Sequence, residues 1–332
     1  MPIFSRHVLE SRKFRMITVR PVQEHEWEAA ARAYSAAHPH EPVSGTDLRR
    51  RQDEQRGWGY TAATLVALDG PEVVGMGAYF QNPGAYHPRR FVLDLGVVPE
   101  RQHQGAGGAL WAAIEADLRG RGAESIRVLA REDHRTAPGF LTRRGFTGGK
   151  RYFTSALDVG AFDPGPFATL RPRLEARGVR IVSLTDLRAA RTPDLPARLH
   201  ALMSDVRTDV PRSEPATPLS FQVFDEAVLG DPGLLPDAYV VAAHGDDFIG
   251  QTVLFASEVS DALYTGLTGV TRAWRGQGVA TVLKLAAIDV ARAHGAPTIR
   301  TDNASDNAPM LAINDRLGFV RDPASVSYLR AF

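Results

Sequence analysis

The chain has 332 residues, which is more than one ordinary domain needs and is enough for two domains of about 150 residues. Its formal net charge is +1, so no strong field attracts nucleic acid or an anionic membrane, and the absence of cysteine excludes disulfides, thiolate metal sites and cysteine nucleophiles. No apolar stretch approaches the ~18 residues of a membrane span, and the N-terminus has no apolar signal segment, so we expect a cytoplasmic protein.

The first half of the chain predicts strands interspersed with helices. Leu110, Ile114 and Leu118 recur at a spacing of four, which is typical of a helix with one buried face. Asp69-Gly70 is a strong hairpin signal. Strands are expected over residues 16–20, 61–68, 73–80, 91–98, 125–130 and 146–157, and helices over residues 24–34, 47–55, 105–121 and 134–144.

The second half predicts the same order of elements. Residues 159–178 contain several prolines and glycines and are expected to be a linker between domains at 1–158 and 179–332. Proline-rich loops are expected over residues 36–46 and 208–220. Strands are expected near residues 180–184, 238–244, 248–255, 263–270, 298–302 and 319–329, and helices over residues 278–294 and 307–317.

An internal repeat underlies this order, and we call its two halves the N-terminal copy and the C-terminal copy. An offset of 173 residues holds without a gap over some fifty residues, which is too long for chance. A slip of two residues separates this block from the preceding strands and is expected in the hairpin near residues 81–90. The offset pairs Gly96 with Gly269, Gln104 with Gln277, Gly105 with Gly278, Leu110 with Leu283, and Gly145-Phe146 with Gly318-Phe319.

In each copy a strand ends and a helix begins at a glycine-rich turn, at Gly105 and at Gly278. The first turn of a helix offers unpaired N–H groups and the positive end of the helix dipole, and glycine lets a ligand approach the backbone closely. Such a turn is suited to a pyrophosphate. Arg275 can add a charged contact in the C-terminal copy, whereas Gln102 takes its place in the N-terminal copy. The spacing fits neither a Rossmann turn nor a P-loop.

The pattern from Val270 to Leu283, with Arg275, Gly276 and Gly278 inside it, resembles the signature of the GNAT-type N-acetyltransferase superfamily. Val97 to Leu110 resembles it too, and Asn307 followed by Leu317-Gly318-Phe319 resembles a second signature. The resemblance covers almost the whole chain as two copies, as in mycothiol synthase-like members, whose C-terminal copy carries the activity. It implies an α/β fold of two GNAT-like domains in tandem, each a mixed, mostly antiparallel sheet flanked by helices.

The resemblance also implies a reaction. An acceptor amine attacks the thioester of acetyl-CoA directly in a ternary complex, with the pyrophosphate on the turn, the pantetheine along the preceding strand and the thioester carbonyl on the backbone N–H of Val270. Coenzyme contacts are expected in the C-terminal copy from Thr268, Gly269, Val270, Arg275, Gly276, Gln277, Gly278, Val279, Ala280, Thr281, Asn303 and Asn307, and in the N-terminal copy from Val97, Val98, Gln102, Gln104, Gly105, Ala106, Gly107 and Gly108.

The sequence departs from the family at the tyrosine that many members use to protonate the leaving thiolate. Asn314 stands at that position in the C-terminal copy and Leu141 in the N-terminal copy, so neither can be that acid, although Asn314 could bind the coenzyme. The N-terminal copy departs further, since His134 replaces Asn307 and Ala130 replaces Asn303. These differences favour the C-terminal copy as the catalytic one.

Three residues are candidates for proton transfer or acceptor binding. Glu258 lies where family bases often lie, but it is also a typical solvated hairpin acid. Tyr264 could bind a substrate, or simply pack on its strand. Asp94 is the odd residue in an apolar strand and must face a cleft or a partner. The repeat offset pairs Asp94 with Leu267.

We therefore predict an acetyl-CoA-dependent N-acetyltransferase that acts on a primary amine of a small molecule or peptide. Loop histidines such as His38 and His40 have no metal-ligand spacing, so no metal is expected, and neither is a nucleic-acid or membrane partner. The chain is expected to be a monomer or a homodimer. The alternatives are a non-catalytic acyl-CoA-binding protein and, with less support, an aminoacyl-tRNA-dependent peptidyltransferase.

Overall fold

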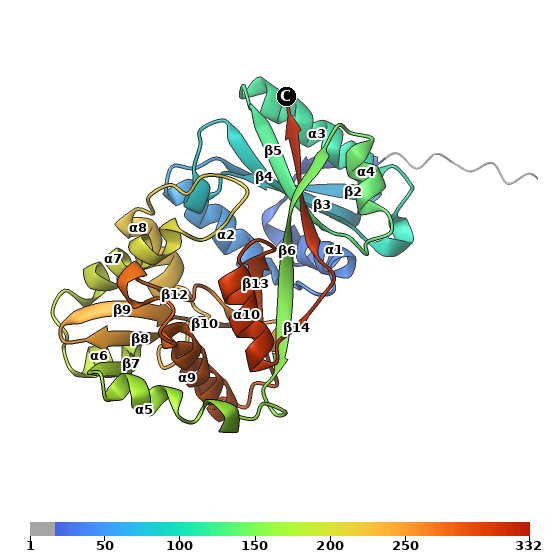
Figure 1. The fold of residues 1–332 in the computed structure, drawn as a ribbon. Helices are drawn as coiled ribbons and strands as arrows, with labels where there is room; N and C mark the ends of the chain where they lie inside the picture. Colours follow the sequence, from blue (N-terminus) through green and yellow to red (C-terminus); the bar gives the residue numbers. More distant parts are fainter. Residues whose placement is uncertain (1–16) are drawn as a thin grey trace, which may run out of the picture.

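The computed structural model describes residues 17–332. Met16, where we expected the first strand to begin, lies outside the described residues, as does the N-terminal stretch in which we expected no signal segment. The N-terminal copy (blue to green) lies in the upper part of Figure 1 and most of the C-terminal copy (yellow to red) in the lower part. Strand β6 (Thr147–Asp158) runs from one to the other.

The N-terminal copy follows the predicted order of elements. Leu110, Ile114 and Leu118 are fully buried, so the helix predicted from their spacing is confirmed, and Ser44 caps the second helix by accepting a hydrogen bond from the Asp47 N–H at 3.0 Å. Its elements besides β6 are β1 (Ile17–Pro21), α1 (Trp27–Ala37), α2 (Gly45–Gly57), β2 (Ala62–Asp69), β3 (Glu72–Phe80), β4 (Arg90–Val97), α3 (Ala106–Gly120), β5 (Ser125–Arg131) and α4 (Ala137–Thr142).

The C-terminal copy repeats this order with more interruptions. Its strands are β7 (Val179–Ser183), β8 (Val240–His244), β9 (Asp247–Thr252), β10 (Leu254–Ser257), β11 (Ser260–Thr265), β12 (Gly269–Val270), β13 (Thr298–Ala304), β14 (Val320–Arg321) and β15 (Ser325–Ala331). Its helices, including one that precedes β7, are α5 (Leu170–Glu175), α6 (Leu184–Ala189), α7 (Leu195–Thr208), α8 (Phe221–Phe224), α9 (Val279–Ala293) and α10 (Ala308–Leu317).

The two copies share one sheet because they exchange their closing strands. Within residues 17–332 an eleven-stranded sheet has the order β1-β2-β3-β4-β5-β15-β6-β13-β11-β10, with β14 beside β6, and β12-β9-β8-β7 form a second sheet. Strand β15 pairs with β5 of the N-terminal copy along its whole length, while β6 pairs with β13 of the C-terminal copy. We expected residues 319–329 to form one strand of the C-terminal copy. That prediction is wrong, because the stretch is divided into β14 and β15 at Pro323, which lacks an N–H for a strand ladder.

Two further predicted strands of the C-terminal copy are broken. Residues 248–255 form β9 and β10 on either side of Val253, and residues 263–270 form β11 and β12 on either side of Gly266. Each break carries the chain from one sheet to the other. The corner is tight, because a Cβ on Gly266 would come within 2.6 Å of Phe255 and 2.9 Å of Val253.

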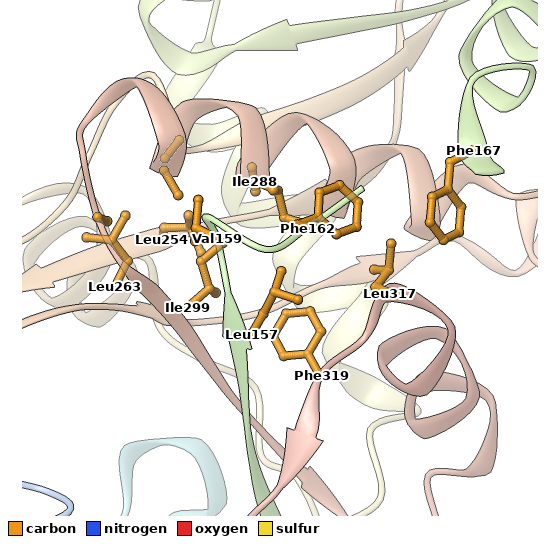
Figure 2. Packing of buried hydrophobic residues seen from close by; sticks show 14 residues of the cluster. Leu157, Val159, Phe162, Phe167, Leu254, Leu263, Ile288, Ile299, Leu317 and Phe319 are labelled. Carbon is orange, nitrogen blue, oxygen red and sulfur yellow. The ribbon is translucent and has the colours of Figure 1, made fainter. Parts of the chain in front are cut away.

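The segment predicted to be a linker is part of the C-terminal core. Val159, Phe162 and Phe167 are buried in a cluster with Ile288 of α9 and Phe319, as Figure 2 shows. Arg292 also donates hydrogen bonds to the carbonyl oxygens of Val159 and Phe162 at 3.1 and 2.9 Å. Because residues 159–178 bury apolar side chains and contain α5, they are a folded segment rather than a flexible connection.

Candidate functional site

The two glycine-rich turns have the same backbone conformation. Gly105 caps the start of α3 with φ 98° and Gly278 caps α9 with φ 89°, both left-handed. Two residues earlier, Gly276 has φ 71° and His103 keeps φ 61° although it is not glycine. A Cβ on Gly105 or Gly276 would meet open space. Both helices therefore begin at a left-handed glycine, and the space beside Gly105 and Gly276 is open.

The polar side chains around the turns also match between the copies. Gln102 Nε2 donates to the Val97 carbonyl at 3.1 Å, and Arg275 Nε donates to the Val270 carbonyl at 2.9 Å. The predicted residues that follow the turns, namely Ala106, Val279 and Thr281, are buried in the first turn of each helix. Gln104 and Gln277 donate to the carbonyls of Glu100 and Ala273, both at 2.9 Å.

A cavity of about 590 Å³ lies beside the N-terminal turn. It forms where the parallel strands β4 and β5 separate, since their last paired residues are Val92 and Arg127. Beyond Val92 the edge of β4 has no partner strand on the β5 side among residues 17–332, so its backbone groups can pair with a ligand. Gln102, Gly105, Gly107 and Gly108 of the predicted set line the cavity, as does Val97, whereas Val98 donates its N–H to the Val74 carbonyl at 3.0 Å.

Two arginines that directly follow α4 supply the positive charge that Gln102 does not. Arg143 and Arg144 line the cavity, and Arg144 Nη2 would lie 3.3 Å from a Cβ on Gly108 in the first turn of α3. Burial and the neighbouring charges of Arg143 and Arg330 lower the pKa of Arg144. We missed these arginines in the sequence. The signal was that Arg144 differs from its repeat partner, Leu317.

Asp94 also lines this cavity, in the middle of β4. Burial raises the pKa of its carboxyl to about 6, and the charges of Arg51 and Arg127 only partly oppose this effect. Within residues 17–332 no hydrogen bond or salt bridge reaches the carboxylate. Tyr34 of α1 and Glu41 lie close enough for the Asp94 charge to raise the pKa of each, in addition to the larger effect of burial.

In the C-terminal copy the turn is engaged by other parts of the chain. Asp209, which follows α7, accepts hydrogen bonds from Arg272 at 2.8 and 2.5 Å and lies 2.8 Å from Nη2 of Arg275. These contacts hold the pKa of Asp209 well below its usual range. Arg177 donates a hydrogen bond to Gln277, and Leu170 of α5 would lie 3.8 Å from a Cβ on Gly278. Arg275, which was predicted to bind a pyrophosphate, is thus already paired with a carboxylate of the chain itself.

The two asparagines predicted to bind the coenzyme are joined to each other. Asn314 is 1% exposed, and its Nδ2 donates to Asn303 Oδ1 at 2.7 Å. Its own Oδ1 is buried and has no partner among the described residues. Asn307 begins α10 without a side-chain cap, whereas its counterpart His134 accepts hydrogen bonds from the N–H groups of Thr136 and Ala137. Asn314 is therefore enclosed by protein and joined to Asn303, with one acceptor oxygen unsatisfied among the described residues.

The candidate catalytic residues Glu258 and Tyr264 of the C-terminal copy lie on the hairpin formed by β10 and β11. Glu258 is exposed at the tip of the β10–β11 hairpin and accepts a hydrogen bond from Ser44 Oγ of the N-terminal copy at 3.0 Å. Tyr264 is half-buried on β11, in register with Phe255 and Arg300. In the strand before the turn, Thr268 and Thr252 share a hydrogen bond at 2.7 Å, and a Cβ on Gly269 would come within 2.6 Å of Val206.

Asp94 has no counterpart in strand register. By its pairing with neighbouring strands, Phe91 occupies the position of Leu263, and Gly96 occupies the position of Gly269. These two points are five positions apart in the N-terminal copy and six in the C-terminal copy, which therefore has one additional residue between them. The offset that pairs Asp94 with Leu267 thus does not hold within this strand. The extra residue falls in the break between β11 and β12.

Two further features of residues 17–332 concern metal ions and membranes. No group of three or more His, Asp or Glu side chains between residues 17 and 332 is arranged to hold a metal ion. None of the helices in this range is long and apolar enough to cross a membrane.

The fold and the paired turns define a class of protein. The sequence profile of the Acetyltransferase (GNAT) family matches residues 24–146 and 199–319, and the chain belongs to this family. Two GNAT domains in tandem, the predicted fold, are thereby confirmed.

Particular relatives are similar over different lengths. The fold is similar to a tandem GNAT protein from the clavulanic acid biosynthesis pathway, with a TM-score of 0.72 and 20% identity over 95% of this chain and 98% of that one. A GCN5-related N-acetyltransferase from Sphaerobacter thermophilus gives a TM-score of 0.68 and 16% identity, with 95% of each chain covered. N-alpha-acetyltransferase 30 of Schizosaccharomyces pombe is 33% identical over 90 residues, which are 26% of this chain and 59% of that protein, less than two thirds of its length.

Proposed function

We propose that the chain transfers an acetyl group from acetyl-CoA to a primary amine by direct attack, and that the cavity at the N-terminal turn is the site of this reaction. The observation that carries the proposal is the 590 Å³ cavity, which joins a helix N-terminus at Gly105 to the free edge of β4. Family membership supports the acetyl transfer. The relative named an N-alpha-acetyltransferase supports an amine as the acceptor.

The residues around the cavity suit a coenzyme with a pyrophosphate and an amide-containing arm. The N–H groups at the start of α3 and the charges of Arg143 and Arg144 favour the phosphates. An anion there would also offset the burial and the repulsion from neighbouring arginines that lower the pKa of Arg144. The edge of β4 beyond Val92 offers N–H and carbonyl groups to the amides of the arm and an N–H to the thioester carbonyl.

The chemistry requires a neutral amine. A primary amine with a pKa near 10 is neutral in only about one molecule in a thousand at pH 7. The nitrogen forms a bond to the carbonyl carbon as the carbon–sulfur bond breaks, and the released thiolate, with a thiol pKa of about 8.5, takes up a proton. A nearby group that accepts the proton of the attacking nitrogen accelerates this step.

Our expectation from the sequence favoured the C-terminal copy, and the N-terminal cavity favours the other. The matched variants Gly105→Tyr and Gly278→Tyr separate the two, because both replace a left-handed glycine at a helix start. We expect Gly105→Tyr to reduce thiol release from acetyl-CoA by a hundredfold or more, on the order of a lost oxyanion or phosphate contact. Gly278→Tyr should keep most of the activity.

The measurement is thiol release with a panel of primary amines, accompanied by circular dichroism to confirm folding. The reverse pattern would place the reaction in the C-terminal copy. Binding of acetyl-CoA without turnover with any amine would favour the non-catalytic acyl-CoA-binding alternative.

A further inference from the structure

Asp94 occupies a distinct place in the N-terminal copy. It follows Val92, the last residue of β4 that pairs with β5, by two positions, so it stands where the two strands separate. Leu93 and Leu95 pack on the α3 side of the sheet. Because side chains alternate along a strand, Asp94 projects to the opposite side, where a Cβ on Gly96 would touch α1 at Tyr34. Its carboxylate thus lies between the free edge of β4 and helix α1.

The charged and titratable groups that face Asp94 come from four elements. They are Tyr34 on α1, Glu41 in the loop after α1, Arg51 on α2 and Arg127 on β5. The two arginines favour the ionised carboxylate from a distance, and neither forms a salt bridge with it among the described residues.

Glu214 of the C-terminal copy reduces the effect of Arg127 on Asp94. Its Oε2 lies 3.5 Å from Arg127 Nε. It is held near the sheet by Ser213, whose Oγ lies 2.8 Å from the Tyr152 hydroxyl. One of the two cations is therefore partly neutralised, and the Asp94 carboxylate stays free to accept a proton.

We propose that Asp94 is the catalytic residue that accepts the proton of the attacking amine nitrogen in the N-terminal copy, and that the acceptor enters from the side of α1 and the 38–44 loop. This inference rests on the proposed acetyl transfer. The acceptor class is a primary amine that arrives as an ammonium ion, since the two carboxylates of Asp94 and Glu41 attract a cation at this end of the cavity.

The protons and bonds of this step balance. The ammonium ion first loses one proton to water in the cavity. The neutral nitrogen then bonds to the thioester carbon while the carbon–sulfur bond breaks, and the second N–H proton passes to the Asp94 carboxylate. Asp94 returns this proton to the departing thiolate, so the products are an amide, the free thiol and one proton released to solvent.

The test compares Asp94→Asn with wild type at several pH values. The probes are acetyl-CoA with n-butylamine, tyramine or a short peptide with a free N-terminus, using the best of the three, and the readout is thiol release. We expect Asp94→Asn to lower kcat/KM at pH 7 by about 10²–10⁴-fold, the range for loss of a general base, with little change in the KM for acetyl-CoA. The deficit should narrow toward pH 9.5 as hydroxide replaces the carboxylate.

Wild-type kcat/KM should show an inflection near pH 6, since the pKa of Asp94 is raised to about 6, and Asp94→Asn should lose it. Asp94→Glu should restore part of the rate. Asp289→Asn, the same change on the exposed face of α9, is the matched control and should behave as wild type.

Three results separate the possible failures. An Asp94→Asn variant with wild-type kcat/KM and an unchanged pH profile would overturn the role of Asp94 and leave the acetyl transfer standing. A uniform loss at every pH, with the inflection retained, would show that Asp94 acts only through structure. A wild-type chain that turns over none of the amines would overturn both proposals.

Discussion

The carboxylate of Asp94, which we propose for catalysis, lowers the stability of the folded protein when it is ionised. A half-buried carboxylate without a hydrogen-bond donor disfavours the folded state whenever it is ionised. Asp209 is the opposite case, because two arginines satisfy its charge at the surface of the C-terminal copy. In one copy a carboxylate of the chain itself thus pairs with the arginine expected to bind a coenzyme phosphate, and in the other a carboxylate without a partner among the described residues lines the cavity.

The pH dependence of stability follows from the raised pKa of Asp94. Its folded-state pKa of about 6 lies above its ordinary value of 3.8, so the folded protein binds this proton more tightly than the unfolded chain does. The contribution to stability is complete below pH ~3.8 and is lost as the pH rises through ~6. Such a shift corresponds to about 3 kcal/mol at most, and water in the cavity reduces it.

We therefore expect Asp94→Asn to raise the free energy of unfolding by roughly 2 kcal/mol at pH 7.5, while its effect fades below pH 4. Urea unfolding at pH 4, 6 and 7.5 measures it, with Asp289→Asn as the control for a surface change of the same type. A variant that is less stable than wild type at pH 7.5 would contradict the assignment of an unsatisfied, half-buried charge.

Asp209 allows a test of the C-terminal turn. Replacing it with alanine frees Arg275 and removes a carboxylate that repels phosphate, so we expect Asp209→Ala to strengthen coenzyme A binding at this turn by about threefold or more. Calorimetry in the Gly105→Tyr background would report on the C-terminal turn alone. Asp205→Ala, one helical turn earlier on α7, is the control. Weaker binding by Asp209→Ala would mean that Asp209 positions Arg275 rather than competing for it.

At the scale of the elements, the sequence predicts features that depend on neighbouring residues and that occur in both copies. The buried helix face of Leu110, Ile114 and Leu118 and the glycine turns that begin helices at residues 105 and 278 follow from short-range rules, and the structure has them. The exchange of β6 and β15 does not follow from such rules, because both closing strands carry a similar pattern and the partner of each lies far away in sequence.

The candidate site shows the same division. The glycine turns could be found because they depend on a few adjacent residues. Arg144 and Asp209 were missed because their roles depend on residues far away in the sequence. Arg144 lies beside Gly108 in the first turn of α3, and Asp209 pairs with Arg275. Asp94 was singled out by its charge in an apolar strand. The cavity that it lines could not be predicted, because the cavity depends on where β4 separates from β5.

The pairing of the exchanged strand β15 with β5 can be tested by removing one backbone hydrogen bond. Ser327 is buried in the middle of β15 and pairs with Leu129 of β5. Ser327→Pro should destabilise the protein by about 3 kcal/mol or more, because proline removes a ladder hydrogen bond in a central strand. Ser327→Ala keeps the N–H and should cost much less. Hydrogen exchange should show lost protection in β5 of the N-terminal copy, and intact protection there would contradict the pairing.

At the scale of the whole molecule, the copies form one cooperative structure. The shared sheet is reinforced by ion pairs and hydrogen bonds between the copies, including Arg330 with Glu115 and Trp58 with Glu226. Each copy alone would expose a long strand edge and part of its core. The unit of folding is thus expected to be the pair of copies rather than one repeat.

A chain divided between Asp163 and Pro164, both exposed, tests this expectation. We expect neither fragment to show a cooperative thermal transition alone, and co-expressed fragments to copurify and regain the wild-type circular dichroism spectrum. A C-terminal fragment that melts cooperatively as a monomer would show that the copies are independent, despite the shared sheet.

The position of β15 also affects the order of events during synthesis. Ser325 at its start lines the cavity of the N-terminal copy, although β5, its neighbour, ends at Arg131. At ~5–20 residues per second, the intervening stretch of about 200 residues takes on the order of 10 to 40 s to synthesise. During that interval β15 is not yet available to pair with β5. A ribosome-bound chain therefore contains the N-terminal turn long before β15 completes the lining of the cavity beside it.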